Sequence, residues 1–116
     1  MDRDMDLVRE LLLQITAKEL QSTEWGDKEI YHLKMLSDVG FIEGIQYKHL
    51  LDGWVAAPSH PQLTWRGHEF LDTIREKSVW DKVKNVAKEK GVGLTIETIT
   101  KIASAVVTAL LTAPKS

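Results

Sequence analysis

The residues best suited to metal chemistry in this chain are His68 and Asp72, which stand four positions apart. On a helix this spacing places both side chains on one face, where they could supply two ligands to a metal ion. A zinc site needs three or four ligands, but the sequence has no cysteine and no HExxH motif. His60 is the nearest other histidine, and it stands beside Pro61 in a proline-flanked segment. We therefore predict no metal site and no cofactor.

Catalytic residue sets are also not recognisable in the sequence. We find no Ser/His/Asp set, no glycine-rich phosphate-binding loop and no pair of carboxylates placed for acid–base chemistry. The absence of cysteine excludes thiolate catalysis and disulfide bonds, and it fits a reducing cytoplasm. We therefore expect a non-enzymatic, cytoplasmic protein with no small-molecule substrate.

Nucleic-acid binding would depend on a helix that we expect to start after Asp27 as its N-cap. The candidate contacts on its outer face are Lys28, Tyr31 and Lys34, and Met35 lies among them. A helix that reads base edges normally presents Arg, Lys, Asn or Gln. Tyr31 and Met35 instead resemble a second packing face, so the pattern favours interaction or packing over base readout. His32, on the same helix, is expected to be hydrogen-bonded in or near the core.

A further nucleic-acid contact is expected from Lys48, which lies in a predicted β-hairpin between Tyr47 and His49. Charge is sparse there, since Glu43 and Asp52 offset the lysine. The whole chain has a net charge of -2 at pH 7, whereas strong nucleic-acid binders have a basic surplus. An ordinary hairpin is the competing interpretation.

Basic residues are most concentrated between residues 66 and 90. Acidic residues are interleaved with them, which is typical of a solvated helix face crossed by salt bridges. We favour that interpretation over a nucleic-acid patch. The basic residues are Arg66, Arg75, Lys77, Lys82, Lys84, Lys88 and Lys90, and the acidic ones are Glu69, Asp72, Glu76, Asp81 and Glu89.

Helical and β patterns position these residues. The first helix is expected from near Arg3 to about Leu20, capped by Asp2 or Asp4. The second helix should end at Gly40, because glycine adopts the left-handed conformation that terminates helices. Two or three short strands follow between residues 42 and 63, with a turn at 52–53, and prolines 58 and 61 argue against a continuous central strand.

The stretch LTWRGHEFLD, residues 63–72, predicts a strand-to-helix corner. Thr64 supplies a side-chain oxygen that can cap the new helix. Gly67 lies in its first turn, where glycine weakens a helix by about 1 kcal/mol relative to alanine. We expect the compensation to be a close approach to another backbone, while Phe70, Leu71 and Ile74 face the core.

Two more helices are predicted at the C-terminal end, one opened by Ser78 and ended by Gly91, and one from Thr95 to Ala113. The apolar sector of the last helix is wide for a single helix on a small domain, which predicts a homodimer built on it. No membrane span is expected, because the longest uncharged stretch is shorter than the ~20 residues needed. The predicted interface residues are Ile99, Ile102, Val106 and Leu110.

The order of elements predicts an α+β, mostly α protein. Residues 1–78 are expected to form a winged-helix-like domain with a small antiparallel β-hairpin, and residues 79–116 a C-terminal helical extension of the same compact unit. The usual winged-helix core has a further helix after the first. Here QSTEWG, residues 21–26, leaves room for a turn at most.

Three stretches carry a resemblance to a known family: MDRDMDLVRELLLQI, YHLKMLSDVGFIEG and LTWRGHEFLDTIREKSVWDKVK. Over about residues 1–90 the chain resembles a family of short uncharacterised proteins of bacteria and their phages, known as a domain of unknown function. The resemblance implies a winged-helix-like fold and brings no activity, substrate or catalytic residue. The spacing of these stretches also resembles winged-helix transcription regulators, but only at the level of fold.

Two functional hypotheses follow. The first is a phage- or prophage-associated regulatory module that binds DNA or descends from one that did. The second is a protein–protein interaction module that uses the same fold without touching DNA. Binding to duplex DNA, and its decrease with salt, would separate them.

Overall fold

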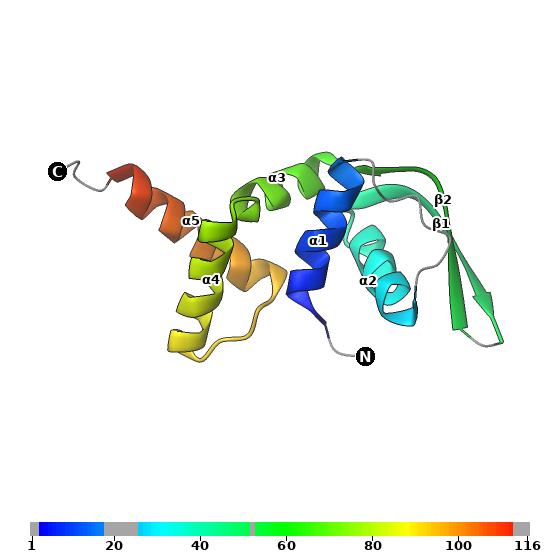
Figure 1. Cartoon of the computed structure of the whole chain (residues 1–116), viewed down its shortest axis with the longest axis horizontal. Coiled ribbons are helices and arrows are strands. Elements are labelled where there is room, and N and C mark those ends of the chain that lie inside the picture. The colour runs from blue at the N-terminus through cyan, green and yellow to red at the C-terminus, as the bar shows by residue number, and fades with distance from the viewer. Residues whose placement is uncertain (1–2, 18–25, 52, 113–116) are drawn as a thin grey trace. The chain divides into compact units, whose positions relative to one another are not determined.

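The computed structural model describes residues 3–17, 26–51 and 53–112. It confirms an α+β, mostly helical chain with one antiparallel hairpin (Figure 1). Two compact units, Met1–Glu69 and Phe70–Ser116, divide the chain within the third helix. The elements are α1 (Met5–Thr16), α2 (Asp27–Asp38), β1 (Ile42–Leu50), β2 (Gly53–Leu63), α3 (Trp65–Ile74), α4 (Lys77–Lys90) and α5 (Ile96–Thr112).

In the first unit, α1 contacts α2 and β2, and α2 contacts both strands. Of the two predicted caps, Asp2 and Asp4, the structure selects Asp4, because its carboxylate accepts the backbone N–H of Leu7 at 3.1 Å. The helix ends at Thr16 rather than near Leu20, directly after its last buried residue, Ile15. Most of the predicted turn at 21–26 lies outside the described residues. The buried stripe of α1 is Met5, Val8, Leu11, Leu12 and Ile15.

Two predicted N-caps are wrong. Asp27 is the first residue of α2, and Gly26 takes the extended cap conformation in its place. Asp27 still suits the positive end of the helix dipole. Ser78 is the second residue of α4, because that helix begins at Lys77, whose ammonium pairs with Asp81 one turn later at 3.2 Å. The end of a helix is commonly misplaced by one or two residues when it is assigned from sequence.

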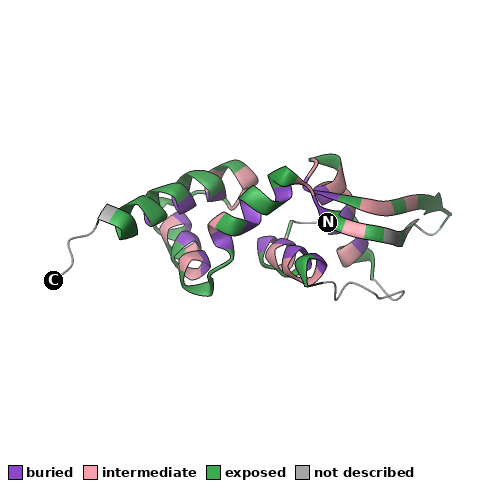
Figure 2. Ribbon diagram, turned by 90° about the horizontal axis from the view of Figure 1, so that it is seen from above, coloured by how far each residue is buried: buried purple, intermediate pink, exposed green. Residues whose placement is uncertain are grey.

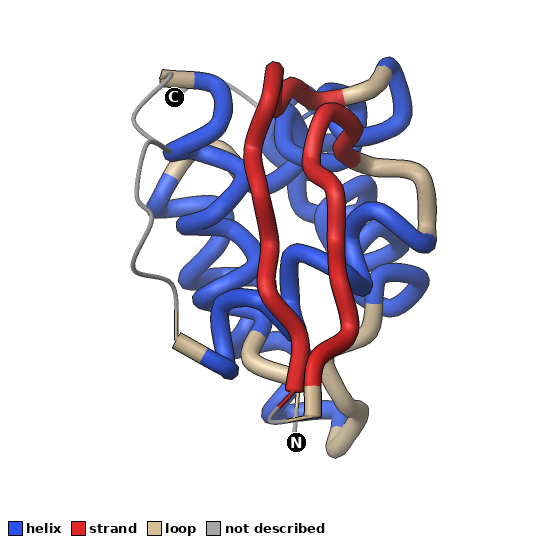
Figure 3. Tube along the Cα trace, turned by 90° about the vertical axis from the view of Figure 1, so that its right-hand side faces the viewer, coloured by secondary structure: helices blue, strands red, loops and turns tan. Residues whose placement is uncertain are grey.

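The hairpin pairs β1 and β2 from Ile42 opposite Leu63 to Leu50 opposite Gly53 (Figure 3). Strand β2 continues through positions 58 and 61 as one strand, so the separate short strands predicted there are wrong, but its regular pairing with β1 is interrupted between Pro58 and Gln62. In the described part of the chain the sheet has two strands, and each is an edge strand. An edge strand tolerates proline because one of its sides needs no N–H donors.

Gly44 accommodates the one irregularity in the hairpin. The register between the strands shifts around this residue. Its φ is +87°, and a β-carbon there would lie 1.9 Å from the carbonyl oxygen of His60. A residue with a side chain would therefore be strained in its backbone and would collide with the opposite strand.

The corner between β2 and α3 is built as the sequence predicts. Thr64 caps α3, because its hydroxyl oxygen accepts the N–H of Gly67 at 3.2 Å, and the hydroxyl donates to the carbonyl of Gly40. The N–H of Thr64 donates to the carbonyl of Phe41 at 2.9 Å. A β-carbon at Gly67 would lie 2.0 Å from that same carbonyl oxygen. The predicted close approach to another backbone is therefore confirmed.

In the second unit, α4 packs on α5. Helix α4 ends, as predicted, at Gly91 with a left-handed φ of +68°. Thr95 caps α5 through its hydroxyl, which accepts the N–H of Thr98 at 3.1 Å. No helix in the described ranges is long and apolar enough to cross a membrane. The buried residues of the unit are Phe70, Leu71, Ile74, Trp80, Val83, Ala87, Ile99, Ile102, Ala103 and Val106.

We predict that Gly67→Ala destabilises the protein by about 3 kcal/mol, because the new methyl group must displace the Phe41 carbonyl or shift α3. Gly67→Leu should destabilise it further. Gly93→Ala is the matched control, since a β-carbon there meets nothing within 4 Å. Urea unfolding followed by circular dichroism measures both. If Gly67→Ala unfolds at the same urea concentration as Gly93→Ala, the backbone of α3 does not approach the Phe41 carbonyl closely enough to exclude a β-carbon.

Candidate binding surfaces

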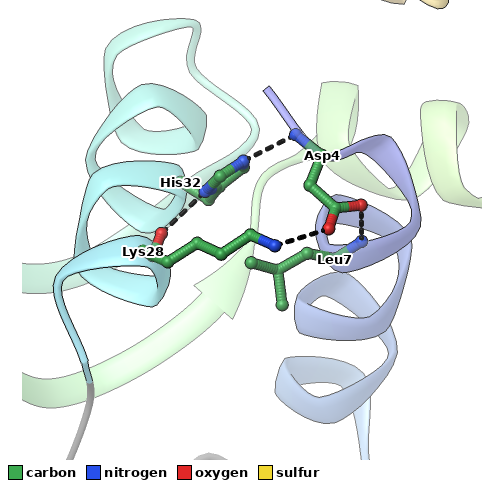
Figure 4. Close-up of polar contacts among 4 residues, drawn as sticks. All are labelled: Asp4, Leu7, Lys28 and His32. Atoms are coloured by element: carbon green, nitrogen blue, oxygen red, sulfur yellow. Dashed lines mark hydrogen bonds and ion pairs between the residues drawn. The ribbon is translucent and has the colours of Figure 1, made fainter. Parts of the chain in front are cut away.

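Lys28, the first predicted nucleic-acid residue, is engaged with α1. Its Nζ atom lies 2.8 Å from Oδ2 of Asp4, whose other oxygen caps α1 by accepting the Leu7 N–H (Figure 4). The hydrogen bond from Lys28, with that from the Leu7 N–H, holds the pKa of Asp4 below its ordinary value of 3.8. The same hydrogen bond to Asp4 raises the pKa of the Lys28 ammonium. Lys28 therefore links α2 to the start of α1.

His32 completes this link and is fully buried, with 0% of its surface exposed. Its Nε2 atom lies 2.8 Å from the backbone N of Asp4, and its Nδ1 atom lies 2.6 Å from the carbonyl oxygen of Lys28. Because the Asp4 N–H can only donate, Nε2 accepts, and Nδ1 carries the proton that it donates to Lys28. The prediction that His32 is hydrogen-bonded in the core is confirmed.

The other predicted nucleic-acid residues lie on two elements. On α2, Tyr31 is exposed and meets the His32 ring edge-on, while Lys34 pairs with Asp38 at 3.2 Å. On β1, Lys48 is exposed. Both lysines on the outer face of α2 thus have a carboxylate partner within the chain. Their role in nucleic-acid binding stays a prediction.

His68 and Asp72, the residues considered for a metal site, are both exposed on α3. Within the described ranges, no group of three or more side chains of the metal-binding types is placed to hold an ion. The pair therefore gains no further ligand from those ranges.

We predict that Asp4→Asn removes a part of the pH dependence of stability. The pKa of Asp4 is lowered on folding, so its contribution is complete above about pH 4 and decreases as the pH falls through the folded-state pKa. Urea unfolding at about pH 6 and about pH 2.5 should therefore show a smaller difference in Asp4→Asn than in the wild type. Asp72→Asn, at an exposed position on α3, is the control and should keep the wild-type difference.

A groove of about 560 Å³ lies between α4 and α5. On α4 its residues recur every four positions, and on α5 they form one stripe of neighbouring turns, so each helix contributes a single face. We refer to the apolar lining residues as the floor and to the three exposed lysines as the edges. The lining residues are Lys82, Val86, Lys90, Lys101, Ile102, Ala105, Val106, Ala109 and Leu110.

The four residues predicted to form a dimer interface do not all line this groove. Ile99 is fully buried and does not line it. Ile102 and Val106 are 9% and 8% exposed and form part of the floor, while Leu110 is 62% exposed. The outer side of α5 stays exposed toward its C-terminal end (Figure 2). Sequence reasoning missed Ala105 as a lining residue.

The sequence places Lys82 and Lys90 on a solvated, salt-bridged helix face and does not indicate that they line a groove. Lys82 and Lys90 are eight residues apart with Val86 midway, so a helical wheel would have aligned all three. That alignment is the signal that could have predicted one wall. The opposite wall could not be predicted, because it depends on how α5 packs on α4.

Residues 2–93 match the protein family described as "Hypothetical protein (DUF2513)". The chain belongs to the DUF2513 family. An "Uncharacterized protein" of Haemophilus influenzae is 35% identical to it over 123 residues, which covers 96% of this chain and 99% of the relative. No solved structure matches. The predicted membership of a family of uncharacterised proteins is therefore confirmed, while the winged-helix and phage aspects stay predictions.

The DUF2513 match includes α1 to α4 and stops at residue 93, before α5. One wall of the groove therefore lies inside the matched region and the other lies outside it. The relative from Haemophilus influenzae aligns over nearly the whole chain.

We predict that the same substitution at two alanines of α5 has very different effects on stability. Ala103 is fully buried, so Ala103→Asp should destabilise the second unit by several kcal/mol, at about the cost of burying an unpaired carboxylate. Ala105 is exposed in the groove, so Ala105→Asp should change stability by less than about 1 kcal/mol. Urea unfolding followed by circular dichroism measures both. Equal destabilisation would show that the groove is closed.

Proposed function

We propose that this DUF2513 protein is a non-catalytic protein-binding module, and that it binds its partner in the groove between α4 and α5. The observation that carries the proposal is the apolar floor of the groove, which continues into the exposed Leu110. Exposed apolar surfaces of this kind commonly mark interfaces. Leu111, at the next position, is also exposed, at 80%.

The first unit supports protein binding over base readout by α2. A reading helix needs side-chain donors directed to base edges. Lys28 is instead held by Asp4, whose carboxylate also caps α1, and Tyr31 offers an aromatic surface. The order of α1, α2, hairpin and α3 is compatible with the predicted winged-helix-like fold. A regulatory role with phage or prophage association stays a prediction from the family resemblance.

DNA binding is the second candidate, and the observation that favours it is the charge of α4. This helix carries five lysines and two acidic residues. Contacts of such lysines with phosphates would be independent of sequence and would weaken steeply with salt. On this alternative the protein would bind duplex DNA weakly and without sequence preference at physiological salt.

We predict that a photo-crosslinking amino acid at position 105 captures a protein in cells of the source organism. The same amino acid at Ser104 is the control, because Ser104 is exposed on α5 but does not line the groove. A protein adduct specific to position 105 is the expected result, read by gel shift and mass spectrometry. The reason is that position 105 lines the groove and position 104 does not, so a partner bound in the groove should contact position 105.

Two results would contradict the proposal. One is equal capture from positions 104 and 105, which would place no partner in the groove. The other is capture of nothing by position 105 together with salt-dependent binding of the purified protein to duplex DNA in fluorescence anisotropy. The second result would favour the DNA-binding candidate.

A further inference from the structure

We infer that the segment bound between α4 and α5 is an amphipathic α-helix of another protein, with Asp or Glu flanking its apolar stripe. This inference rests on the proposed function and names the chemistry of the partner. Three features carry it: the shape of the groove, the lysines at its edges and the charge of the unit that contains it.

The shape of the groove suits a third helix. Its α5 wall consists of Ile102, Ala105, Val106, Ala109 and Leu110, which follow the i, i+3, i+4, i+7, i+8 pattern of one helix face. Ridges of a partner helix pack into grooves between such rows. The short side chains of the two alanines allow its backbone to approach closely. The described part of the second unit contains no strand that could pair with an extended peptide.

The edges of the groove are basic on both sides. Lys82 and Lys90 stand on the α4 side, and neither forms an ion pair within the described part of the chain. The nearby Asp81 is engaged by Lys77 at 3.2 Å and approached by Lys84 at 3.9 Å. Two lysines at one edge are therefore available to acidic side chains of a bound helix.

Lys101 stands on the α5 side, where its Nζ lies 3.1 Å from Oε1 of Glu97. Both side chains are more than three-quarters exposed, at 76% and 77%. An exposed pair of this kind contributes little to stability and is easily exchanged. A partner carboxylate can therefore compete for Lys101.

The charge of the two units agrees with an acidic partner. Residues 70–116 contain eight basic and five acidic residues, whereas residues 1–69 contain seven basic and twelve acidic ones. The groove thus belongs to the basic unit of an acidic chain. Attraction of this kind sets specificity and association rate more than affinity.

A second copy of the chain fits the groove less well. Pairing two copies groove to groove about a two-fold axis would place the same surface on both sides, so the edge lysines of one copy would meet those of the other. Like charges across an interface disfavour the pairing. We therefore assign the groove to another protein, and the predicted homodimer becomes an outcome that the test can reveal.

The test uses the full chain and two 18-residue model peptides with one shared leucine stripe, flanked either by Glu or by Lys. Fluorescence anisotropy of labelled peptides at low salt should show the Glu-flanked peptide binding at least about tenfold tighter than the Lys-flanked one. The double variant Lys82→Glu/Lys90→Glu should reverse this preference. Ala105→Asp should abolish binding of the Glu-flanked peptide while leaving the circular dichroism spectrum unchanged.

Lys88→Glu is the matched charge control, because Lys88 is exposed on α4 but does not line the groove. It should keep the preference for the Glu-flanked peptide. Equal binding of both peptides, or equal weakening by the control, would overturn the inference. So would a doubled mass in light scattering that Ala105→Asp returns to 13.1 kDa, since it would place a second copy in the groove. Crosslinking from position 105 without binding of either peptide would overturn this inference and leave the proposed function standing.

Discussion

The contact between Gly67 and the carbonyl of Phe41 is the constraint on which the first unit depends. It brings three elements to one point, because Phe41 follows α2, Thr64 follows β2 and Gly67 lies in the first turn of α3. Two residues after the end of α2, Gly40 takes a left-handed conformation, and its carbonyl accepts the Thr64 hydroxyl. A side chain at position 67 would push α3 away from the carbonyl of Phe41. The angle between α3 and β2 would then change.

A polar link complements this backbone contact at the other end of α2. Asp4 receives Lys28 on its carboxylate and gives its backbone N–H to His32. From the sequence, a lysine, a histidine and an aspartate could each be assigned to function. In the structure, these three residues are hydrogen-bonding partners of one another. Buried or partly buried polar groups need such partners, since a buried donor or acceptor without one is costly. This is the physical reason why α2 offers less to a ligand than its sequence indicates.

The second unit uses its residues differently. Helices α4 and α5 bury one side of each helix and leave an apolar groove with lysines at both edges. Leu110, which lines the groove, and Leu111, which follows it, are both exposed. A small protein gains stability from burying such residues, so their exposure has a cost that a bound partner would remove. Asp4, Lys28 and His32 therefore serve the fold of the first unit, and the exposed apolar residues of the second unit are the best candidates for binding.

The sequence by itself determined several features that local sterics control: the Thr64 cap, the helix ends at Gly40 and Gly91, and the close approach at Gly67. Each depends on a few neighbouring residues or on the absence of a side chain. Only the tertiary structure decided that Lys28 pairs with a residue 24 positions away, that β2 passes through its prolines, and that Lys82 and Lys90 face α5 across a groove. These depend on which elements meet, and helical or strand periodicity shows which face is apolar without showing its neighbour.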